Sequence, residues 1–257
     1  MTILAYDATF GGFLTAVFEV YERKLGAVKI LPEAEAQAGL FGNLIHIQTV
    51  EEKQLRVWRG LQKKLSVEGL KKLYSAFLSE LPGWEDYALS AIRHVFSHTE
   101  NVEEDFGHEG ILWIAQTARK VWREKHRMEA FVRFQKLGDG LFYAFVEPDS
   151  NVLPLITAHF RSRYADQDWI IYDGKRRYGI HHTHATGEIK EVQLEWTEGA
   201  VSGKPDATIL DEREALFQTL WRDYFKHTGI PARKNPKLHL QHMPVRYWKH
   251  LTEKMIG

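Results

Sequence analysis

The chain has 257 residues, 44% of them hydrophobic, and its 34 basic and 34 acidic residues give a formal net charge of zero. A chain of this length can bury a core and form one large or two modest domains. Because the whole chain carries no excess of positive charge, any argument for nucleic-acid binding must come from local charge. The sequence has no cysteine, which excludes disulfides, a thiol nucleophile, a thiolate zinc site and a Cys-ligated iron–sulfur cluster.

No apolar run approaches the ~20 residues that are needed to span a bilayer. The first ten residues, MTILAYDATF, lack the basic start, apolar stretch and small-residue cleavage site of a secretion signal. We therefore expect a cytoplasmic protein with no membrane partner. The short motifs of phosphate-binding loops, dinucleotide-binding folds, serine hydrolases and zinc peptidases are also missing, which disfavours these chemistries, and no cofactor is expected.

Hydrophobic periodicity predicts a mixed but mainly helical first region. A short apolar strand leads into an amphipathic helix that Gly26 ends, a second strand follows a loop, and a helical period then continues to about residue 128. Pro82-Gly83 interrupts this helical stretch, and an acidic segment at 100–109 indicates a solvated connection. The strands are expected at 3–6 and 44–50, the loop at 32–42, and the helices within 10–25, 52–65, 70–81, 88–96 and 109–128.

Beyond Ala130 the period changes to two, which is typical of strands. Two such runs flank Gly138-Asp139-Gly140, and an Asp-Gly pair in this position is a strong hairpin signal. A helix with Ser150 or Asn151 as its N-cap follows, then three strands and two C-terminal helices. The hairpin strands are expected at 131–137 and 141–147, the helices at 151–164, 211–227 and 246–254, and the three strands at 169–172, 177–182 and 188–195.

These elements predict an α+β fold with two domains. Residues 1–128 form a mixed, mainly helical N-terminal region, and residues 129–257 form an α+β module with a basic C-terminal tail. In that module the order β-β-α-β-β-β predicts an antiparallel sheet that a helix covers on one face, with further helices at the C-terminus.

A first concentration of positive charge lies at 113–136, where seven Lys or Arg and two Glu give a net charge of +5. Arg119, Arg123 and Arg127 are spaced by four and so share one face of a helix, and Arg133 follows them. Such a face is either a solvated surface or a surface that contacts nucleic-acid phosphates.

The C-terminal segment 222–254 is a second concentration, with eight Lys or Arg against two acidic residues and aromatic residues interleaved. Cations among aromatic rings suit single-stranded nucleic acid, because rings stack on bases while cations hold the backbone. The alternative is that the aromatic residues are core and the cations only surround it. The best binding candidates are Arg233, Lys234 and Lys237, in a loop flanked by prolines, together with Arg246.

Two carboxylates, Glu147 and Asp149, follow the predicted hairpin at alternate positions, with His159 as the nearest titratable partner. Neighbouring carboxylates suit an acid/base pair or a cation site. The alternative is that they cap the following helix and interact with its dipole. If the chain is catalytic, these three residues are the candidates.

Two groups of histidines have the spacing of metal ligands. His182 and His184 fall on one face of a strand, next to His181, and His94 and His98 form an i, i+4 pair on a helix. Neither group has an obvious third ligand in the sequence, so no specific metal site is expected.

Several segments, spread over most of the chain, carry a resemblance to a known family. They are YDATFGGFLTAVFEVYERK at 6–24, VWRGLQKKLS at 57–66, EKHRM at 124–128, FVRF at 131–134, DG at 139–140, EPDSNVLPL at 147–155, HF at 159–160, WIIYD at 169–173, RKNPKL at 233–238 and MPVRYWKHLTE at 243–253. Together they resemble a bacterial family described as "probable DNA metabolism protein", a domain of unknown function. Residue 150 is Ser where that family often has His.

The resemblance implies a place in DNA metabolism rather than a reaction. Members of the family are paired with a radical-SAM protein of DNA modification or repair, and related domains are fused to uracil-DNA glycosylase-like domains. Because this chain has no cysteine, the iron–sulfur cluster of a radical-SAM reaction must belong to the partner. The leading hypothesis is a DNA repair or modification accessory factor, non-enzymatic or conditionally catalytic, that binds DNA, single-stranded DNA included, and presents it to the radical-SAM partner. The alternatives are an enzyme that acts on a damaged or modified base through Glu147 or Asp149, and a protein-interaction scaffold.

Overall fold

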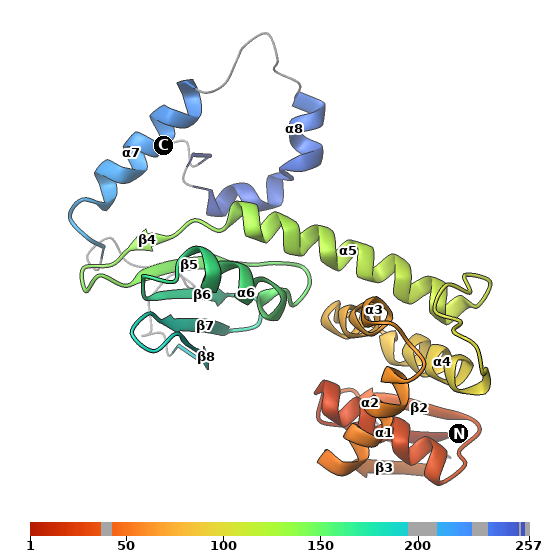
Figure 1. The fold of residues 1–257 in the computed structure, drawn as a ribbon. Helices are drawn as coiled ribbons and strands as arrows, with labels where there is room; N and C mark the ends of the chain where they lie inside the picture. Colours follow the sequence, from red (N-terminus) through yellow and green to blue (C-terminus); the bar gives the residue numbers. More distant parts are fainter. Residues whose placement is uncertain (37–42, 195–209, 228–235, 252, 255–257) are drawn as a thin grey trace. The chain divides into compact units, whose positions relative to one another are not determined.

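The computed structural model describes residues 1–36, 43–194, 210–227, 236–251 and 253–254. Helices and two sheets make the fold α+β, as the sequence predicts (Figure 1). The chain divides into two compact units, residues 1–122 and 123–257, and the division falls inside one long helix, α5 (Glu109–Phe131). Among the described residues, no helix is both long enough and apolar enough to cross a lipid bilayer.

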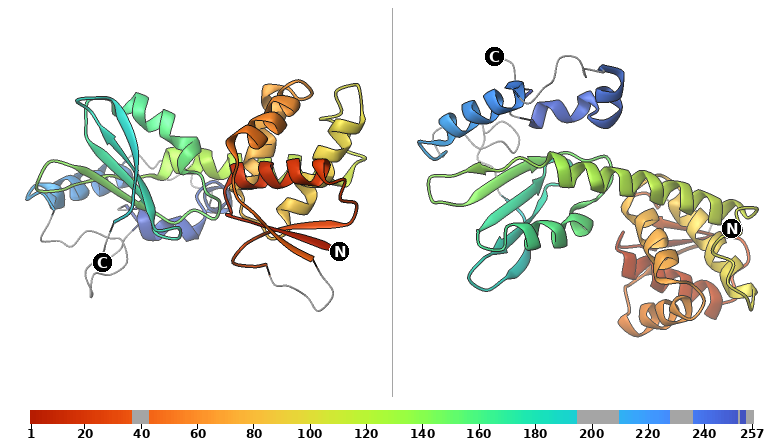
Figure 2. Two further views of the ribbon diagram at one scale, coloured as in Figure 1. Left: turned by 90° about the horizontal axis from the view of Figure 1, so that it is seen from below. Right: turned by 45° about the horizontal axis from the view of Figure 1, so that its top comes forward.

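The first unit contains a three-stranded parallel sheet, in which β1 (Thr2–Tyr6) lies between β2 (Val28–Pro32) and β3 (Asn43–Ile47). The helix α1 (Phe10–Glu22) connects β1 to β2 and lies across the sheet (Figure 2, left), as a connection between parallel strands requires. Its first turn is capped by the Thr9 side chain, which accepts a hydrogen bond from the Gly12 amide.

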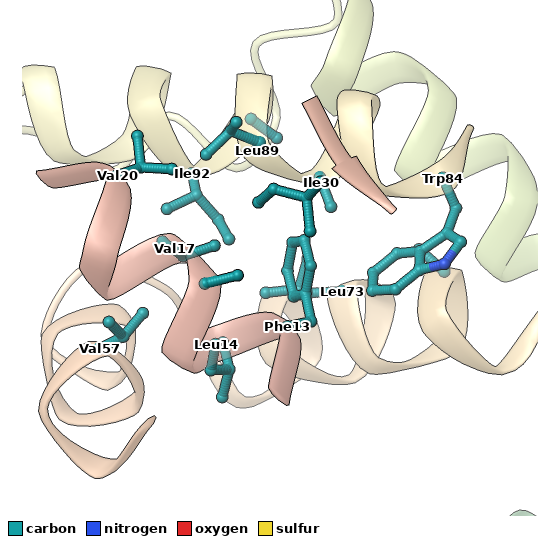
Figure 3. Close-up of a cluster of buried hydrophobic side chains, with 14 of the residues drawn as sticks. Phe13, Leu14, Val17, Val20, Ile30, Val57, Leu73, Trp84, Leu89 and Ile92 are labelled. Carbon is teal, nitrogen blue, oxygen red and sulfur yellow. The ribbon is translucent and has the colours of Figure 1, made fainter. Parts of the chain in front are cut away.

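Three helices follow in this unit and match the predicted helical stretch. They are α2 (Glu51–Gln62), α3 (Val67–Leu78) and α4 (Trp84–Ser97). Their apolar faces and α1 enclose the core of the unit (Figure 3). At its centre the ring of Phe13 is fully buried, and its centroid lies 4.5 Å from that of Trp84. The turn between α3 and α4 uses Gly83, whose φ of +78° is strained for any other residue.

The second unit is built on a five-stranded sheet with the order β4-β5-β6-β7-β8. The predicted order β-β-α-β-β-β is confirmed, with the helix α6 against one face of the sheet (Figures 1 and 2). Gly140 has a φ of +92° in the turn of the first hairpin. The strands are β4 (Gln135–Lys136), β5 (Phe142–Val146), β6 (Trp169–Asp173), β7 (Tyr178–Thr183) and β8 (Glu188–Val192), and α6 is Leu153–Arg163.

One strand pair departs from the expected antiparallel arrangement. The pairs β4-β5, β6-β7 and β7-β8 are antiparallel, whereas β5 and β6 are parallel. The reason is the intervening helix, because α6 carries the chain back along the sheet and β6 therefore starts at the same end as β5.

The C-terminal part contains α7 (Glu214–His227), α8 (Pro236–His242) and a 3-10 helix, η3 (Val245–His250). Two local expectations were wrong. Lys237 lies in a helix and not in a loop, and the first hairpin strand is only two residues long, since α5 continues to Phe131 and residues 132–134 are neither helix nor strand. The longer α5 is supported by the ring of Phe131, whose centroid lies 5.6 Å from that of Tyr247 in η3.

Candidate nucleic-acid interface

The two basic segments predicted from the sequence meet in the second unit. Arg127 on α5 donates a hydrogen bond to a backbone carbonyl of α8 (3.2 Å), and Arg133 pairs with Glu253 (2.8 Å). Arg246 pairs with Glu124 (3.3 Å between Nη2 and Oε1). Three of the predicted phosphate-contacting arginines therefore hold the C-terminal segment against α5 and the residues that follow it.

The other basic candidates have different surroundings. Arg119 and Arg123 are exposed on α5, Arg119 in the first unit and Arg123 in the second, and their spacing places them on one face of that helix. Lys237 is exposed on α8. Arg233 and Lys234 lie outside the described residues.

The buried carboxylate of Glu124 organises the polar contacts around the loop that follows β5. Glu124 is only 4% exposed. It accepts hydrogen bonds from the amides of Asp149 (2.8 Å) and Ser150 (3.0 Å) and from the hydroxyl of Tyr247 (3.1 Å). With Arg246 as a fourth partner, this one side chain joins α5, the loop after β5 and the C-terminal segment.

The two candidate catalytic carboxylates are also paired with the C-terminal segment. Glu147 pairs with Lys249 and lies 3.1 Å from Nε2 of His250, and Asp149 pairs with Arg246. These contacts give both carboxylates a part in holding the C-terminal segment in place. The hypothesis that they act as an acid/base pair stays a prediction.

The backbone of the same loop is fixed by Arg176. Its guanidinium donates to the carbonyls of Pro148 (3.1 Å) and Asp149 (2.9 Å) and pairs with the fully buried Asp173 (2.8 Å). Burial disfavours the charged form of Asp173 and raises its pKa, although Arg176 opposes this effect. The loop is therefore held from two sides, by Glu124 and by Arg176.

The expected N-cap of α6 was wrong. The residue at that position is Val152, which has no side chain able to cap, and Ser150 and Asn151 lie before it. The Asn151 side chain instead accepts a hydrogen bond from the hydroxyl of Tyr178 on β7. A contact with the neighbouring strand thus replaces the local contact that the sequence favours.

We expect the contribution of Glu147 to stability to disappear in acid. Burial disfavours its charged form, but the pairs with Lys249 and His250 outweigh that effect, so its pKa lies below its ordinary value of 4.5. A lowered pKa means that the stabilisation is complete above the unfolded-state pKa and is lost as the pH falls through the folded-state pKa. Urea denaturation of the wild type and Glu147→Gln should therefore differ most at neutral pH and converge in acid.

The exposed Glu212 provides a control for this experiment. Glu212→Gln should leave the urea midpoint close to that of the wild type at every pH. A difference between wild type and Glu147→Gln that stays constant from neutral pH into acid would contradict the assignment of this carboxylate to ion pairs.

A large cleft opens in the second unit, with a volume of about 1100 Å³. It lies between the end of α5 with β4, the helix α6, and the helix α7. Aromatic, basic and acidic side chains all line it. The lining residues are Glu129, Ala130, Val132, Arg133, Phe134, Lys136, Phe142, His159, Phe160, Arg163, Tyr164, Gln167, Asp211, Arg213, Glu214, Phe217, Gln218, Leu220 and Trp221.

Aromatic residues line the cleft on both sides. The partly exposed ring of Phe134 packs against Phe160 and Tyr164, with centroid distances of 5.7 and 5.3 Å. Across the cleft, α7 contributes Phe217 and Trp221, which are 53% and 39% exposed. Rings that remain this exposed beside a cleft are suited to contact a ligand with flat faces.

The charges that line the cleft divide into paired and exposed groups. Asp211 pairs with Lys136 (3.1 Å), and the carboxylate of Glu214 accepts a hydrogen bond from the Lys136 amide (3.0 Å). By contrast, Arg163 and Arg213 are exposed, and neither has an ion-pair partner within the described part of the chain. The cleft therefore presents two exposed guanidinium groups, and that of Arg163 lies over the Tyr164 ring, 5.8 Å from its centroid.

The third catalytic candidate, His159, lines this cleft. Its Nδ1 lies 3.9 Å from Oε1 of Glu129, which also pairs with Lys125 (2.6 Å). Glu147 and Asp149 are instead engaged with the C-terminal segment, so the structure gives His159 a different carboxylate neighbour from the one that the sequence suggests.

The histidine groups flagged by their spacing have contacts of their own. His182 is buried and stacks on Trp169 at an interplanar angle of 17°, and His184 pairs with Asp168 (2.9 Å). In the first unit His94 pairs with Asp105 (2.9 Å), and its ring lies beside that of His98, 4.3 Å between centroids. Over the described residues, no group of three His, Asp or Glu side chains is arranged to hold a metal ion.

Sequence reasoning missed Glu124, the cleft arginines and Phe217 as candidate functional residues. A signal existed for Glu124, because it lies on the same helix face as the buried residues Val121 and Met128 and so interrupts an apolar stripe. The cleft residues come from segments spread between residues 129 and 221, and no local pattern shows that α6 and α7 line the same cleft.

Comparison with known proteins shows that part of the chain matches a protein family. A family model described as DUF4130, a domain of unknown function, matches residues 82–253. The match includes all of the cleft residues and the loop after β5. No curated protein matches the chain.

Proposed function

We propose that this chain, which belongs to the DUF4130 family, is a DNA-binding accessory protein of DNA repair or modification. In this proposal it binds DNA and presents it to a radical-SAM partner, as the resemblance to the "probable DNA metabolism protein" family implies. The absence of cysteine is consistent with this division of labour, because a cysteine-ligated cluster must then belong to another chain.

The observation that carries the proposal is the cleft of the second unit. Exposed Arg163 and Arg213 line it together with aromatic rings, whereas Arg246 and Lys249 of the C-terminal segment are paired with carboxylates. Proteins that bind single strands combine these two groups, because cations contact phosphates and rings contact bases. A chain of zero net charge can bind DNA through such a cleft, since screening makes local charge dominate.

We expect Arg163→Ala to weaken DNA binding and to reduce its salt dependence. Removing one phosphate contact should lower the magnitude of the slope of log K against log salt by roughly 0.7–1. The affinity for a single-stranded oligonucleotide of about 16 nucleotides would be measured by fluorescence anisotropy between about 50 and 200 mM salt. A duplex of the same sequence provides the comparison.

The matched control is Arg161→Ala. Arg161 is exposed on the same helix and carries the same charge, but it does not line the cleft. An equal loss of affinity and slope in both variants would assign the effect to general charge and not to the cleft. No binding of the wild type to either DNA at low salt, alone or with the radical-SAM partner, would contradict the proposed function. A salt-resistant complex with that partner would then favour the scaffold hypothesis.

A further inference from the structure

We propose that the cleft lined by α6 and α7 binds one unpaired base of single-stranded DNA, with aromatic rings on the faces of the base and arginines on the flanking phosphates. This inference rests on the proposed function and deepens it, because it names the part of the nucleic acid that the cleft receives. The cleft volume of about 1100 Å³ slightly exceeds the upper end of the range of roughly 300–1,000 Å³ that small-molecule sites span, so a nucleotide has room.

The first argument is the chemistry of the walls. Phe134 and Tyr164 form one wall, with ring planes at 71° to each other, and Phe217 stands on α7. Phe217 is 53% exposed, although a phenylalanine is ordinarily buried. The faces of every base are apolar and flat, and stacking on a ring is worth about 1–3 kcal/mol per base. A base between these walls would cover aromatic surface that is otherwise in water.

The second argument is the polar groups between the walls. His159, 38% exposed, and Gln167 line the same cleft. Imidazole and amide groups both donate and accept hydrogen bonds, which suits the edge of a base that has lost its pairing partner. An entirely apolar groove would leave those base edges without partners.

The third argument is charge. The carboxylates of Glu129 and Asp211 are paired with lysines, whereas Arg163 and Arg213 are exposed. Guanidinium groups recognise phosphate oxygens with two parallel hydrogen bonds. An apolar peptide would cover the rings but would leave these cations without an anionic partner, so charge complementarity favours a nucleic acid over a protein segment.

The strand must be unpaired at the bound position. Bases in a duplex are stacked on both faces and paired along their edges, so their faces reach a protein ring only after they leave the stack. Single-stranded DNA presents those faces at a much smaller energetic cost. We therefore expect the wild type to bind single strands more tightly than duplex.

The experiment compares two single-stranded oligonucleotides of about 16 nucleotides, one with normal bases and a central 2-aminopurine, the other abasic throughout. Phe217→Ala should weaken binding of the first by about tenfold or more, because stacking is lost, and should leave binding of the abasic backbone unchanged. The change in 2-aminopurine fluorescence on binding should disappear in this variant. The control is Leu216→Ala, because Leu216 is 56% exposed and adjacent on α7 but does not line the cleft. It should bind both oligonucleotides like the wild type.

The outcomes separate this inference from the proposed function. Two results would overturn the base-binding inference while DNA binding stands. One is that the wild type binds both oligonucleotides equally; the other is that Phe217→Ala and Leu216→Ala lose the same affinity. If the wild type binds neither oligonucleotide, the proposed function itself fails. Displacement of the bound oligonucleotide by an amphipathic helical peptide but not by a mononucleotide would assign the cleft to a protein partner, and would also overturn the inference.

Discussion

Glu124→Ala is expected to lower the free energy of unfolding of the second unit by about 3–5 kcal/mol, because each donor left without its acceptor costs about 1–3 kcal/mol. Glu124 is buried, and its removal leaves the amides of Asp149 and Ser150 without their acceptor and the Arg246 guanidinium without one of its carboxylate partners. Buried donors that lose their acceptor retain the full cost of desolvation, which explains why the effect exceeds that of an ordinary hydrogen bond.

Urea denaturation measures this loss, and hydrogen exchange of the Asp149 and Ser150 amides gives a local readout. The control is His126→Ala, because His126 lies on the same helix and its side chain is 85% exposed. His126→Ala should change the free energy of unfolding by no more than about 0.5 kcal/mol. A Glu124→Ala protein with a wild-type midpoint and protected amides would show that the carboxylate does not organise the loop.

Phe13→Ala should destabilise the first unit by a similar amount, about 3–5 kcal/mol, because a large buried ring is replaced by a cavity. Phe13 is fully buried, and its ring contacts those of Tyr6, Phe10 and Trp84. The tightly packed side chains around Phe13 in Figure 3 can relax into such a space only in part.

The comparison variant is Phe106→Ala, which removes the same ring from a position that is 43% exposed. Its effect should remain below about 1 kcal/mol. Thermal unfolding followed by circular dichroism measures both variants. If both variants lost the same stability, burial would not determine how much these rings contribute to the free energy of unfolding.

Elements with strong local signals were predicted correctly. Period-two alternation and Asp139-Gly140 predicted the hairpin, and the helical period predicted α2 to α4. The strand β2 was missed because Val28–Pro32 is only five residues long and Lys29 interrupts its apolar residues, so it has no clear strand-specific signal. The end of α5 was misplaced because FVRF favours a strand locally, while the contact between Phe131 and Tyr247 supports a helix.

The candidate site could be predicted only in part, because its ion pairs join residues that are far apart in the sequence. Counting charge along the sequence finds the basic segments, but it cannot show that Arg133 pairs with Glu253 or Arg246 with Glu124. Those partners lie 120 and 122 positions away. Predicted binding residues thus became structural ones, and the exposed arginines of the cleft, Arg163 and Arg213, had no local signal that distinguished them from other surface cations.

The ion pairs of the C-terminal segment also act as non-covalent cross-links between distant parts of the chain. The pair between Arg133 and Glu253 closes a loop across 120 positions. The entropy of closing a loop grows slowly with its length, by about 0.6 kcal/mol for each doubling. Extra residues inserted between β8 and α7 would therefore change the closure entropy very little. Lengthening the chain within this loop would therefore leave the C-terminal segment attached at almost the same free energy.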